Sequence, residues 1–289
     1  MSMGRRVRYL LEAAGAWLIY GLFRMLPMRV ASPFGGWLLR KIGPHMGVHR
    51  VAIANLQRAF PEMDSATRQQ TLQAMWDNLG RTLGELPHIP RLRGEGFRRH
   101  ITPTGWEYVD NAKAAGKGLI LFSGHFANWE IMPRTASEMQ TPMTLIYRPP
   151  NNPYVDALIR RSRKYSSAGM YAKGREGGRQ VLKTILKGGA AGMLVDQKMN
   201  DGIEVPFFGY PAMTAPAMAE IALKTGAALL PARVVRVAPL QFRVDISPPL
   251  ETAGKSPAEI MQNVHTLFEQ WIREYPAQWF WVHRRWPKM

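Results

Sequence analysis

The chain has 289 residues, of which 46% are hydrophobic and 20% are charged, and it contains no cysteine. This composition is that of a globular protein of one large domain or one and a half, and it argues against a disordered or low-complexity chain. The lack of cysteine excludes disulfides and thiolate metal sites. Thirty-eight Lys and Arg against 21 Asp and Glu give a net charge of +17, which suits nucleic acid, anionic lipid or an acidic protein as partner. Because no nucleic-acid-binding motif accompanies the charge, we expect no nucleic acid partner.

The N-terminal segment, residues 1–30, predicts a membrane-associated helix. Its apolar run, residues 9–23, carries Glu12 and is shorter than the about 20 apolar residues that a spanning helix needs. We therefore expect a helix that lies in the membrane interface or inserts shallowly. A signal peptide and a simple buried helix are the alternatives. Aromatic and basic side chains in and around the run favour the interface: Arg5, Arg6, Arg8, Trp17, Tyr20 and Trp37.

Helices are expected to dominate residues 31–100. The pattern predicts one helix over 46–60 and a second over 65–83, capped by Asp64 or Ser65. His45 and His49 have a spacing that could bind a metal on one helix face, but no third ligand accompanies them. We interpret both as surface or packing histidines.

Over residues 101–289 the sequence pattern changes to short apolar runs that alternate with helical stretches. This pattern predicts an α/β core with a mixed, mostly parallel sheet flanked by helices. The expected strands are 119–122, 144–147, 191–195, 229–237 and 242–246. The first three end in polar residues, and the carboxyl ends of parallel neighbouring strands meet at one edge of a sheet. We therefore expect an enzyme whose site lies at that edge.

The first of these strands ends at His125, and Glu130 follows five residues later. A neutral imidazole can take a proton from a hydroxyl, and a carboxylate on its other nitrogen would fix the tautomer. Five residues advance a helix by roughly 500°, so the two side chains cannot share one helix face. We expect His125 in a strand-to-helix turn, with Asn128 as the helix N-cap and Glu130 in the first turn, reaching back to His125. This is the chemistry of moving an acyl group onto an alcohol.

Further candidate residues follow the other strands. Arg148 comes after 144–147 and could bind a phosphate or an oxyanion. The segment 173–179 opens a helix, where Arg175 and the glycines could form an anion site or simply a turn. Asp196 and Gln197 could hold the substrate or order neighbouring loops. An aromatic loop could line an acyl-chain site or serve ordinary packing, and its two phenylalanines are Phe207 and Phe208.

Four stretches, in this order, resemble the bacterial lipid A biosynthesis acyltransferases, the late lauroyl and myristoyl transferases of the lysophospholipid acyltransferase-like superfamily. They are 55–62 (Asn-Leu-x-x-Ala-Phe-Pro-Glu), 124–130 (Gly-His-Phe-Ala-Asn-Trp-Glu), Asp196-Gln197 with 207–209 (Phe-Phe-Gly), and 279–286 (Trp-Phe-Trp-Val-His-Arg-Arg-Trp). The resemblance covers nearly the whole chain. The family's His-x4-acid motif falls on His125 and Glu130, where Glu replaces the Asp common in glycerolipid enzymes.

The resemblance implies a glycerolipid acyltransferase-like fold at the cytoplasmic face of the bacterial inner membrane. It implies acyl carrier protein as thioester donor and co-substrate, and a hydroxyl on a lipid A precursor, a phosphorylated glycolipid, as acceptor. The expected mechanism is general-base catalysis by His125 and Glu130, without a covalent acyl-enzyme, a metal or another cofactor. Two alternatives remain open: a lysophospholipid or other hydroxylated lipid as acceptor, and a non-catalytic lipid-binding or carrier-docking protein.

Overall fold

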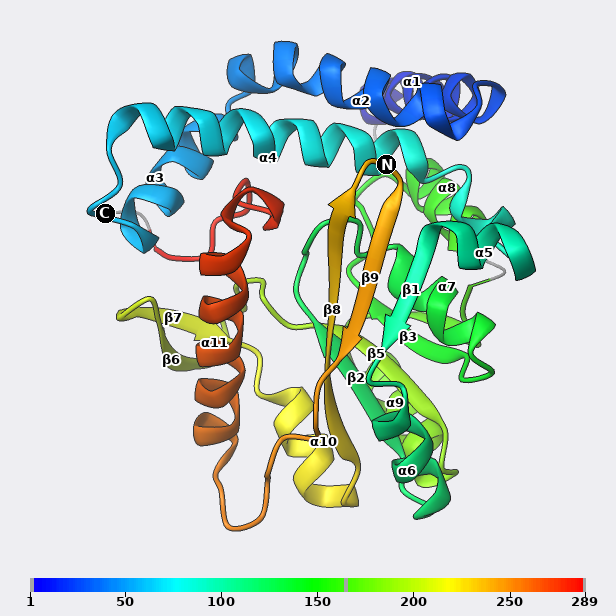
Figure 1. The fold of residues 1–289 in the computed structure, drawn as a ribbon, viewed down its shortest axis with the longest axis vertical. Coiled ribbons are helices and arrows are strands. Elements are labelled where there is room, and N and C mark those ends of the chain that lie inside the picture. Colours follow the sequence, from blue (N-terminus) through cyan, green and yellow to red (C-terminus); the bar gives the residue numbers. More distant parts are fainter. Residues whose placement is uncertain (1–2, 164–165, 288–289) are drawn as a thin grey trace.

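The computed structural model describes residues 3–163 and 166–287, and within them a seven-stranded sheet forms the centre of the molecule (Figure 1). The strand order is β1-β9-β8-β2-β5-β3-β4. Strands β8, β2, β5, β3 and β4 run parallel, whereas β9 pairs antiparallel with β8 and β1 runs parallel to β9. The strands are β1 (Ile101–Thr104), β2 (Leu119–Ser123), β3 (Met143–Tyr147), β4 (Gly169–Ala172), β5 (Ala190–Leu194), β8 (Ala228–Ala238) and β9 (Gln241–Ile246). The prediction of a mixed, mostly parallel sheet is confirmed.

Helices cover both faces of the sheet and one of its ends. They are α1 (Met3–Met25), α2 (Met28–Ile42), α3 (His49–Ala59), α4 (Ser65–Glu85), α5 (Gly94–His100), α6 (Glu107–Ala114), α7 (Ile131–Glu138), α8 (Pro153–Arg163), α9 (Arg175–Leu186), α10 (Ala217–Thr225) and α11 (Pro257–Glu274), with short 3₁₀ turns η1 (Gly43–His45), η2 (Ile89–Arg91) and η3 (Pro276–Gln278). Helices α1, α2 and α4 lie across the end of the sheet to which β8 points (Figure 1). A separate hairpin, β6 (Ile203–Phe207) and β7 (Tyr210–Thr214), lies beside α11.

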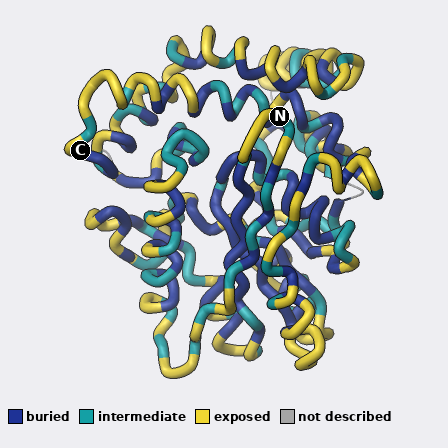
Figure 2. Tube along the Cα trace, in the orientation of Figure 1, coloured by how far each residue is buried: buried dark blue, intermediate teal, exposed yellow. Residues whose placement is uncertain are grey.

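Every residue of β2 is buried, because helices pack on both faces of the sheet. Successive side chains of a strand point to opposite faces, so Leu119 and Leu121 join one hydrophobic cluster while Ile120 and Phe122 join the other. The colours of Figure 2 show this buried centre and the exposed outer turns of the helices. Sequence reasoning missed the short strands β1, β4, β6 and β7, each of only four or five residues.

Helices α2 and α4 pack with their backbones in direct contact at glycines. A Cβ atom on Gly35 would lie 2.3 Å from the carbonyl oxygen of Gly80, and one on Gly80 would lie 2.1 Å from that of Gly35. A Cβ on Gly84 would lie 2.2 Å from the carbonyl oxygen of Ala31. Only glycine permits this approach, which fixes α4 beneath α2.

Helix α1 presents most of its surface to the outside. Only Ala13 and Phe23 of this helix are buried, so the alternative of a simple buried N-terminal helix is wrong. In the described part of the chain, no helix has the length and apolar content required to cross a membrane. Glu12, which interrupts the apolar run, accepts a hydrogen bond of 3.0 Å from Asn152 Nδ2 just before α8. The same amide donates to the carbonyl of Tyr9, and together these bonds attach α1 to the core.

Candidate active site

His125 lies in the turn between β2 and α7, as its position after a buried strand predicted. The helix that follows begins later than expected. Glu130 is the N-cap of α7, and Asn128 is instead completely buried and donates from Nδ2 to Glu85 Oε2 over 2.8 Å. The turn therefore presents the imidazole at the carboxyl end of β2, where parallel α/β sheets place their sites.

The carboxylate that holds His125 is Asp196. Its Oδ1 lies 2.7 Å from His125 Nδ1, and its Oδ2 accepts the backbone N–H of His125 over 2.8 Å. Asp196 follows β5, which is the parallel neighbour of β2, so the predicted convergence of strand ends brings the two residues together. Burial alone would raise the pKa of Asp196, but the charge and hydrogen bonds of His125 outweigh burial and hold that pKa well below its ordinary value.

The expectation that Glu130 fixes the tautomer of His125 is wrong. Glu130 Oε2 accepts a hydrogen bond of 2.7 Å from Arg163 Nε, and Oε1 accepts from Arg163 Nη2 and from Trp129 Nε1. Burial would raise the pKa of Glu130, yet the Arg163 guanidinium outweighs it and keeps that pKa below its ordinary value, with a smaller contribution from His125. The oxygens of Glu130 thus bind Arg163 and Trp129 rather than His125.

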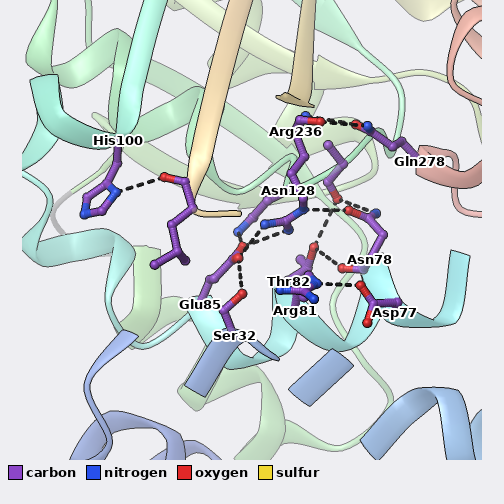
Figure 3. Close-up of polar contacts among 12 residues, drawn as sticks. Ser32, Asp77, Asn78, Arg81, Thr82, Glu85, His100, Asn128, Arg236 and Gln278 are labelled. Carbon is purple, nitrogen blue, oxygen red and sulfur yellow. Dashed lines mark hydrogen bonds and ion pairs between the residues drawn. The ribbon is translucent and has the colours of Figure 1, made fainter. Parts of the chain in front are cut away.

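A second layer of hydrogen bonds fixes the turn that carries His125 to α4 (Figure 3). Ala127 has a φ of 46°, a conformation that is strained for a residue with a side chain. Its carbonyl accepts hydrogen bonds from Asn78 Nδ2 and Thr82 Oγ1, and its N–H donates to the carbonyl of Gln278. The buried carboxylate of Glu85 accepts from Asn128 and from Ser32, and it forms an ion pair with Arg236. Together these contacts hold the backbone of the turn in place and keep Ala127 in its strained conformation.

The C-terminal segment, residues 278–286, completes the site from the opposite end of the chain. Trp279 Nε1 donates to Asp196 Oδ2 over 2.9 Å, and the backbone N–H of Phe280 donates to the carbonyl of His125. The rings of Trp129 and Phe280 pack against the imidazole, with centroids 5.0 and 5.7 Å away. Hence His125 is fixed on both its polar and its apolar sides.

A cavity of about 380 Å³ opens in front of the histidine. His125 and Glu130 line it, as do Arg148 after β3 and Gln197, whose Nε2 lies 3.5 Å from His125 Nε2. Much of the remaining wall is apolar and comes from the sheet and from α7, α9 and α10: Met132, Met143, Leu145, Val181, Met218 and Ile221. Three further cations border the cavity: Arg163, Lys173 and Lys198. The arrangement places the His125 imidazole at the wall of an apolar chamber with basic residues beside it.

Four residues predicted to contact the substrate do not line the cavity: Asp196, described above, and Arg175, Phe207 and Phe208. Phe207 and Phe208 are buried and do not line the cavity; the ring of Phe207 stacks on Trp286, with centroids 5.4 Å apart. Apolar packing, the alternative for that aromatic loop, describes them better. Arg175 is exposed at the start of α9 and does not line the cavity, although Lys173 and Gly174 of the same segment do.

Sequence reasoning missed Arg163 and Trp279, and it left Asp196 as a substrate residue. Arg163 comes 33 residues after its partner Glu130, and Trp279 comes 83 residues after Asp196, so no local spacing pairs them. The prediction that His45 and His49 serve packing or the surface fits their places: His45 is exposed, and His49 Nδ1 accepts a hydrogen bond from Trp76 Nε1.

Comparison with known proteins gives this site a context. The family model described as bacterial lipid A biosynthesis acyltransferase matches residues 3–288. The chain is 26% identical to the lipid A biosynthesis palmitoleoyltransferase of Escherichia coli over 81% of its own length and 77% of that protein. It is 28% identical to the lipid A biosynthesis lauroyltransferase of the same organism, over 82% and 77% of the two chains.

A relative with another acceptor is nearly as similar. The phosphatidylinositol mannoside acyltransferase of Mycobacterium tuberculosis is 25% identical over 80% of this chain and 75% of that protein. The family match extends over almost the entire chain and includes His125, Glu130, Asp196 and the C-terminal segment that fixes them. The chain belongs to the bacterial lipid A biosynthesis acyltransferase family, and it is an acyltransferase.

Proposed function

We propose that this protein moves a fatty acyl chain from the thioester of acyl carrier protein to a hydroxyl of a lipid A precursor. The observation that carries the proposal is the His125 imidazole, whose Nδ1 is bound to the buried Asp196 while the ring lines an apolar cavity. An imidazole held in this way is a general base with Nε2 available to a hydroxyl. Membership in the lipid A acyltransferase family supports the choice of acceptor.

The proposed reaction has two steps. His125 Nε2 takes the proton of the acceptor hydroxyl, and the resulting oxygen nucleophile forms a bond to the thioester carbonyl carbon. The tetrahedral intermediate then collapses: the carbon–sulfur bond breaks, the carrier thiolate leaves, and His125 returns the proton to sulfur. Asp196 stabilises the imidazolium that forms between the two steps, because its charge lies against Nδ1. The route forms no acyl-enzyme and is proposed to use no metal or other cofactor.

Glu130 contributes to the same transition state from a greater distance. Its carboxylate stays ionised because Arg163 lowers its pKa, and its charge favours protonated His125. The ion pair also holds the Arg163 guanidinium at the cavity wall. Arg148, exposed at the end of β3, and neighbouring backbone N–H groups are proposed to stabilise the oxyanion.

The charge and surface of the molecule suit both substrates and a place on a membrane. Acyl carrier protein is acidic and the acceptor is phosphorylated, so a net charge of +17 favours encounter with either. The exposed apolar side chains of α1 would enter the interface of the bacterial inner membrane on its cytoplasmic face, where the lipid acceptor resides. Membrane lipids are therefore partners as well.

The test is an assay with acyl carrier protein thioester and purified lipid A precursor, read by release of the carrier thiol and by the mass of the lipid. We expect His125→Ala to reduce transfer by orders of magnitude while the protein remains folded. His45→Ala is the matched control, because this histidine is exposed in η1, far along the chain from the site. Near-normal transfer by His125→Ala would refute the catalytic assignment.

Glu130→Gln tests the electrostatic role separately. The amide keeps the size of the side chain but removes the charge that favours the imidazolium, so turnover should fall strongly while the KM for the lipid changes less. A defect confined to KM would contradict this role and would assign Glu130 and its partner Arg163 to substrate binding.

A second acceptor deserves the same assay, because the mycobacterial relative is named for phosphatidylinositol mannoside. The acyl-accepting hydroxyl would then belong to another glycolipid or to a lysophospholipid, with the chemistry at His125 unchanged. Competition between purified acceptors distinguishes the two candidates. A preference for the lysophospholipid or the mannoside over the lipid A precursor would replace the acceptor without altering the mechanism.

A further inference from the structure

A second and larger cavity lies apart from the catalytic one, between α1, η2, α8 and β4. It is a cleft of about 1190 Å³, and five arginines from four segments line it: Arg24, Arg91, Arg93, Arg160 and Arg161. No acidic residue is among the described residues that line it. Five positive charges around one concave surface repel one another, and a bound anion would relieve that repulsion.

Few groups of the protein itself neutralise the charge of three of these arginines. Within the residues that the structure describes, no carboxylate forms an ion pair with Arg24, Arg91 or Arg161. Arg24 donates only to the carbonyl of Pro87, at 3.5 Å, and Arg161 lies over the ring of Trp17, 5.9 Å from its centroid. Arg160 is different, because Asp156 pairs with it at 2.9 Å. Hence most of the charge in the cleft is available to a ligand.

The position of the cleft on α1 indicates where its ligand comes from. One stripe of this helix lines the cleft with Trp17, Gly21 and Arg24. The neighbouring stripe, about 100° around the helix, consists of Leu18, Leu22 and Met25, which are 74%, 48% and 84% exposed. An anion that enters the cleft beside this apolar stripe would carry apolar chains on the same side. That combination describes an anionic lipid better than an acidic protein.

Helix α8, which packs against α1, contributes residues to both cavities. Ile159 and Arg163 of α8 line the catalytic cavity, while Ala157, Arg160 and Arg161 line the cleft. A lipid headgroup in the cleft would therefore lie on the other side of one helix from the Glu130–Arg163 pair.

We propose that this cleft binds the phosphate of an anionic lipid headgroup at the membrane surface, through the guanidinium groups of Arg24, Arg91 and Arg161. The proposal rests on the membrane attachment of α1 proposed above. Guanidinium groups form two parallel hydrogen bonds to phosphate oxygens, which an ammonium group cannot do. Trp17 and Tyr20 supply aromatic rings to the lining of the cleft, and such rings are favoured at a membrane interface.

The first variant fills the cleft without changing its charge. Gly21 lines the cleft, and a Cβ atom there would have no neighbour within 4 Å, so Gly21→Trp occupies the space while α1 keeps its backbone. Gly15→Trp is the matched control, because Gly15 lies in the same helix with equal free space but does not line the cleft. Both variants add the same apolar surface to α1.

The second variant removes charge. Arg91→Ala with Arg161→Ala eliminates two cations of the cleft, and Lys183→Ala with Lys187→Ala removes two exposed cations from α9 and its end as the control. Any two cations near an anionic surface weaken binding somewhat. Only the loss of the two cleft arginines should weaken vesicle binding beyond this general effect.

Binding is measured by co-sedimentation of the full chain with phosphatidylcholine vesicles, with and without phosphatidic acid. We expect both cleft variants to bind phosphatidic acid vesicles roughly tenfold more weakly than their controls, and each to bind pure phosphatidylcholine vesicles as well as its own control does. Inorganic phosphate should compete for the phosphatidic acid-dependent part in the control proteins only. The proposal fails if cleft variants and controls bind phosphatidic acid vesicles equally, or if Gly21→Trp weakens binding to acyl carrier protein while leaving vesicle binding intact.

Acyl transfer to a detergent-dispersed acceptor separates this proposal from the proposed function. A wild-type protein without transfer activity refutes the proposed reaction, whereas the vesicle result for the cleft stands on its own. Conversely, an active enzyme with indistinguishable cleft variants and controls refutes only the headgroup site.

Discussion

The buried carboxylate of Asp196 accepts three hydrogen bonds, two from His125 and one from Trp279. It is completely enclosed, with a side chain of 0% exposure, and it does not line the cavity. In the proposed reaction, Asp196 is therefore a positioning residue that acts through the imidazole. The carboxylate keeps the proton of neutral His125 on Nδ1, which leaves Nε2 free to accept the proton of the hydroxyl.

Asp196→Asn preserves the shape of this side chain but removes its charge and presents an amide that can donate to Nδ1. The wrong tautomer then predominates and the imidazolium loses its partner, so we expect kcat to fall by about 10³–10⁴-fold with little change in KM. Asp201→Asn, an exposed residue five positions along, is the control. Steady-state kinetics with the carrier thioester measure both. Normal turnover by Asp196→Asn would mean that the hydrogen bond to His125 Nδ1 does not contribute to kcat.

His265 determines part of the pH dependence of stability. Its Nδ1 lies 2.7 Å from the carbonyl of Pro206 and its Nε2 accepts a hydrogen bond from Arg285, so the folded protein holds it neutral. Burial, with the nearby Arg285 charge, lowers the pKa of His265 from 6.5 to about 3. Between these values the unfolded chain binds a proton that the folded chain does not. The stability is therefore fully present above pH 6.5 and is lost as the pH falls toward 3.

We expect the free energy of unfolding of the wild type to decrease between about pH 7 and pH 5, and His265→Gln to reduce that slope. The slope will not vanish, because burial also lowers the pKa of His88 and of His283. Urea titrations across this range give the comparison, with the exposed His45→Gln as control. An unchanged slope in His265→Gln would show that this imidazole does not couple folding to pH.

At the scale of elements, helix α4 determines both the packing of the N-terminal helices and the geometry of the catalytic turn. One of its faces carries Gly80 and Gly84, which contact α2, and another carries Asn78 and Thr82, which hold the carbonyl of Ala127. A displacement of α4 by a few tenths of an ångström would therefore be transmitted to His125, two residues before Ala127.

Gly80→Ala tests this coupling. Its Cβ would lie 2.1 Å from the carbonyl oxygen of Gly35, so the two helices must separate, at a cost of about 1–3 kcal/mol in the free energy of unfolding. Turnover should fall as well, because α4 anchors the turn. Gly96→Ala in α5 has no neighbour within 4 Å and should be neutral or stabilising by about 0.4–1 kcal/mol. Equal stability of the two variants would contradict the close backbone packing.

Sequence patterns predicted the elements that carry the site well, but they predicted the contacts between those elements poorly. The apolar run of β2 and the polar residues after β2, β3 and β5 indicated where the site lies, because parallel strands bring such ends together. Spacing within the chain suggested Glu130 as the partner of His125, but the partner lies 71 residues away. Neither the bond from Trp279 nor the ion pair between Glu85 and Arg236 has a local signature, since each depends on how distant segments fold together.

At the scale of the whole molecule, the apolar surface is concentrated at one end. Large side chains exposed on α1 and α2 include Leu11, Leu18, Met25, Val30 and Trp37. These helices lie beyond the carboxyl ends of the parallel strands, on the same end of the molecule as the catalytic turn (Figure 1). A membrane that receives this surface would therefore lie near the end of the sheet that carries the proposed active site.

Leu11→Gln with Leu18→Gln should weaken binding to phosphatidylcholine vesicles without lowering the melting temperature, because these side chains are 70% and 74% exposed and contribute little to the core. Burial of one leucine contributes about 1.5–3 kcal/mol, so the loss of two should reduce vesicle affinity by at least tenfold. Leu186→Gln is the matched control: Leu186 is 69% exposed, but it ends α9 at the opposite, amino end of the parallel strands. If all three leucines contribute equally to vesicle binding, the membrane does not contact α1 preferentially. A selective loss at α1 would instead orient the catalytic end of the sheet toward the bilayer.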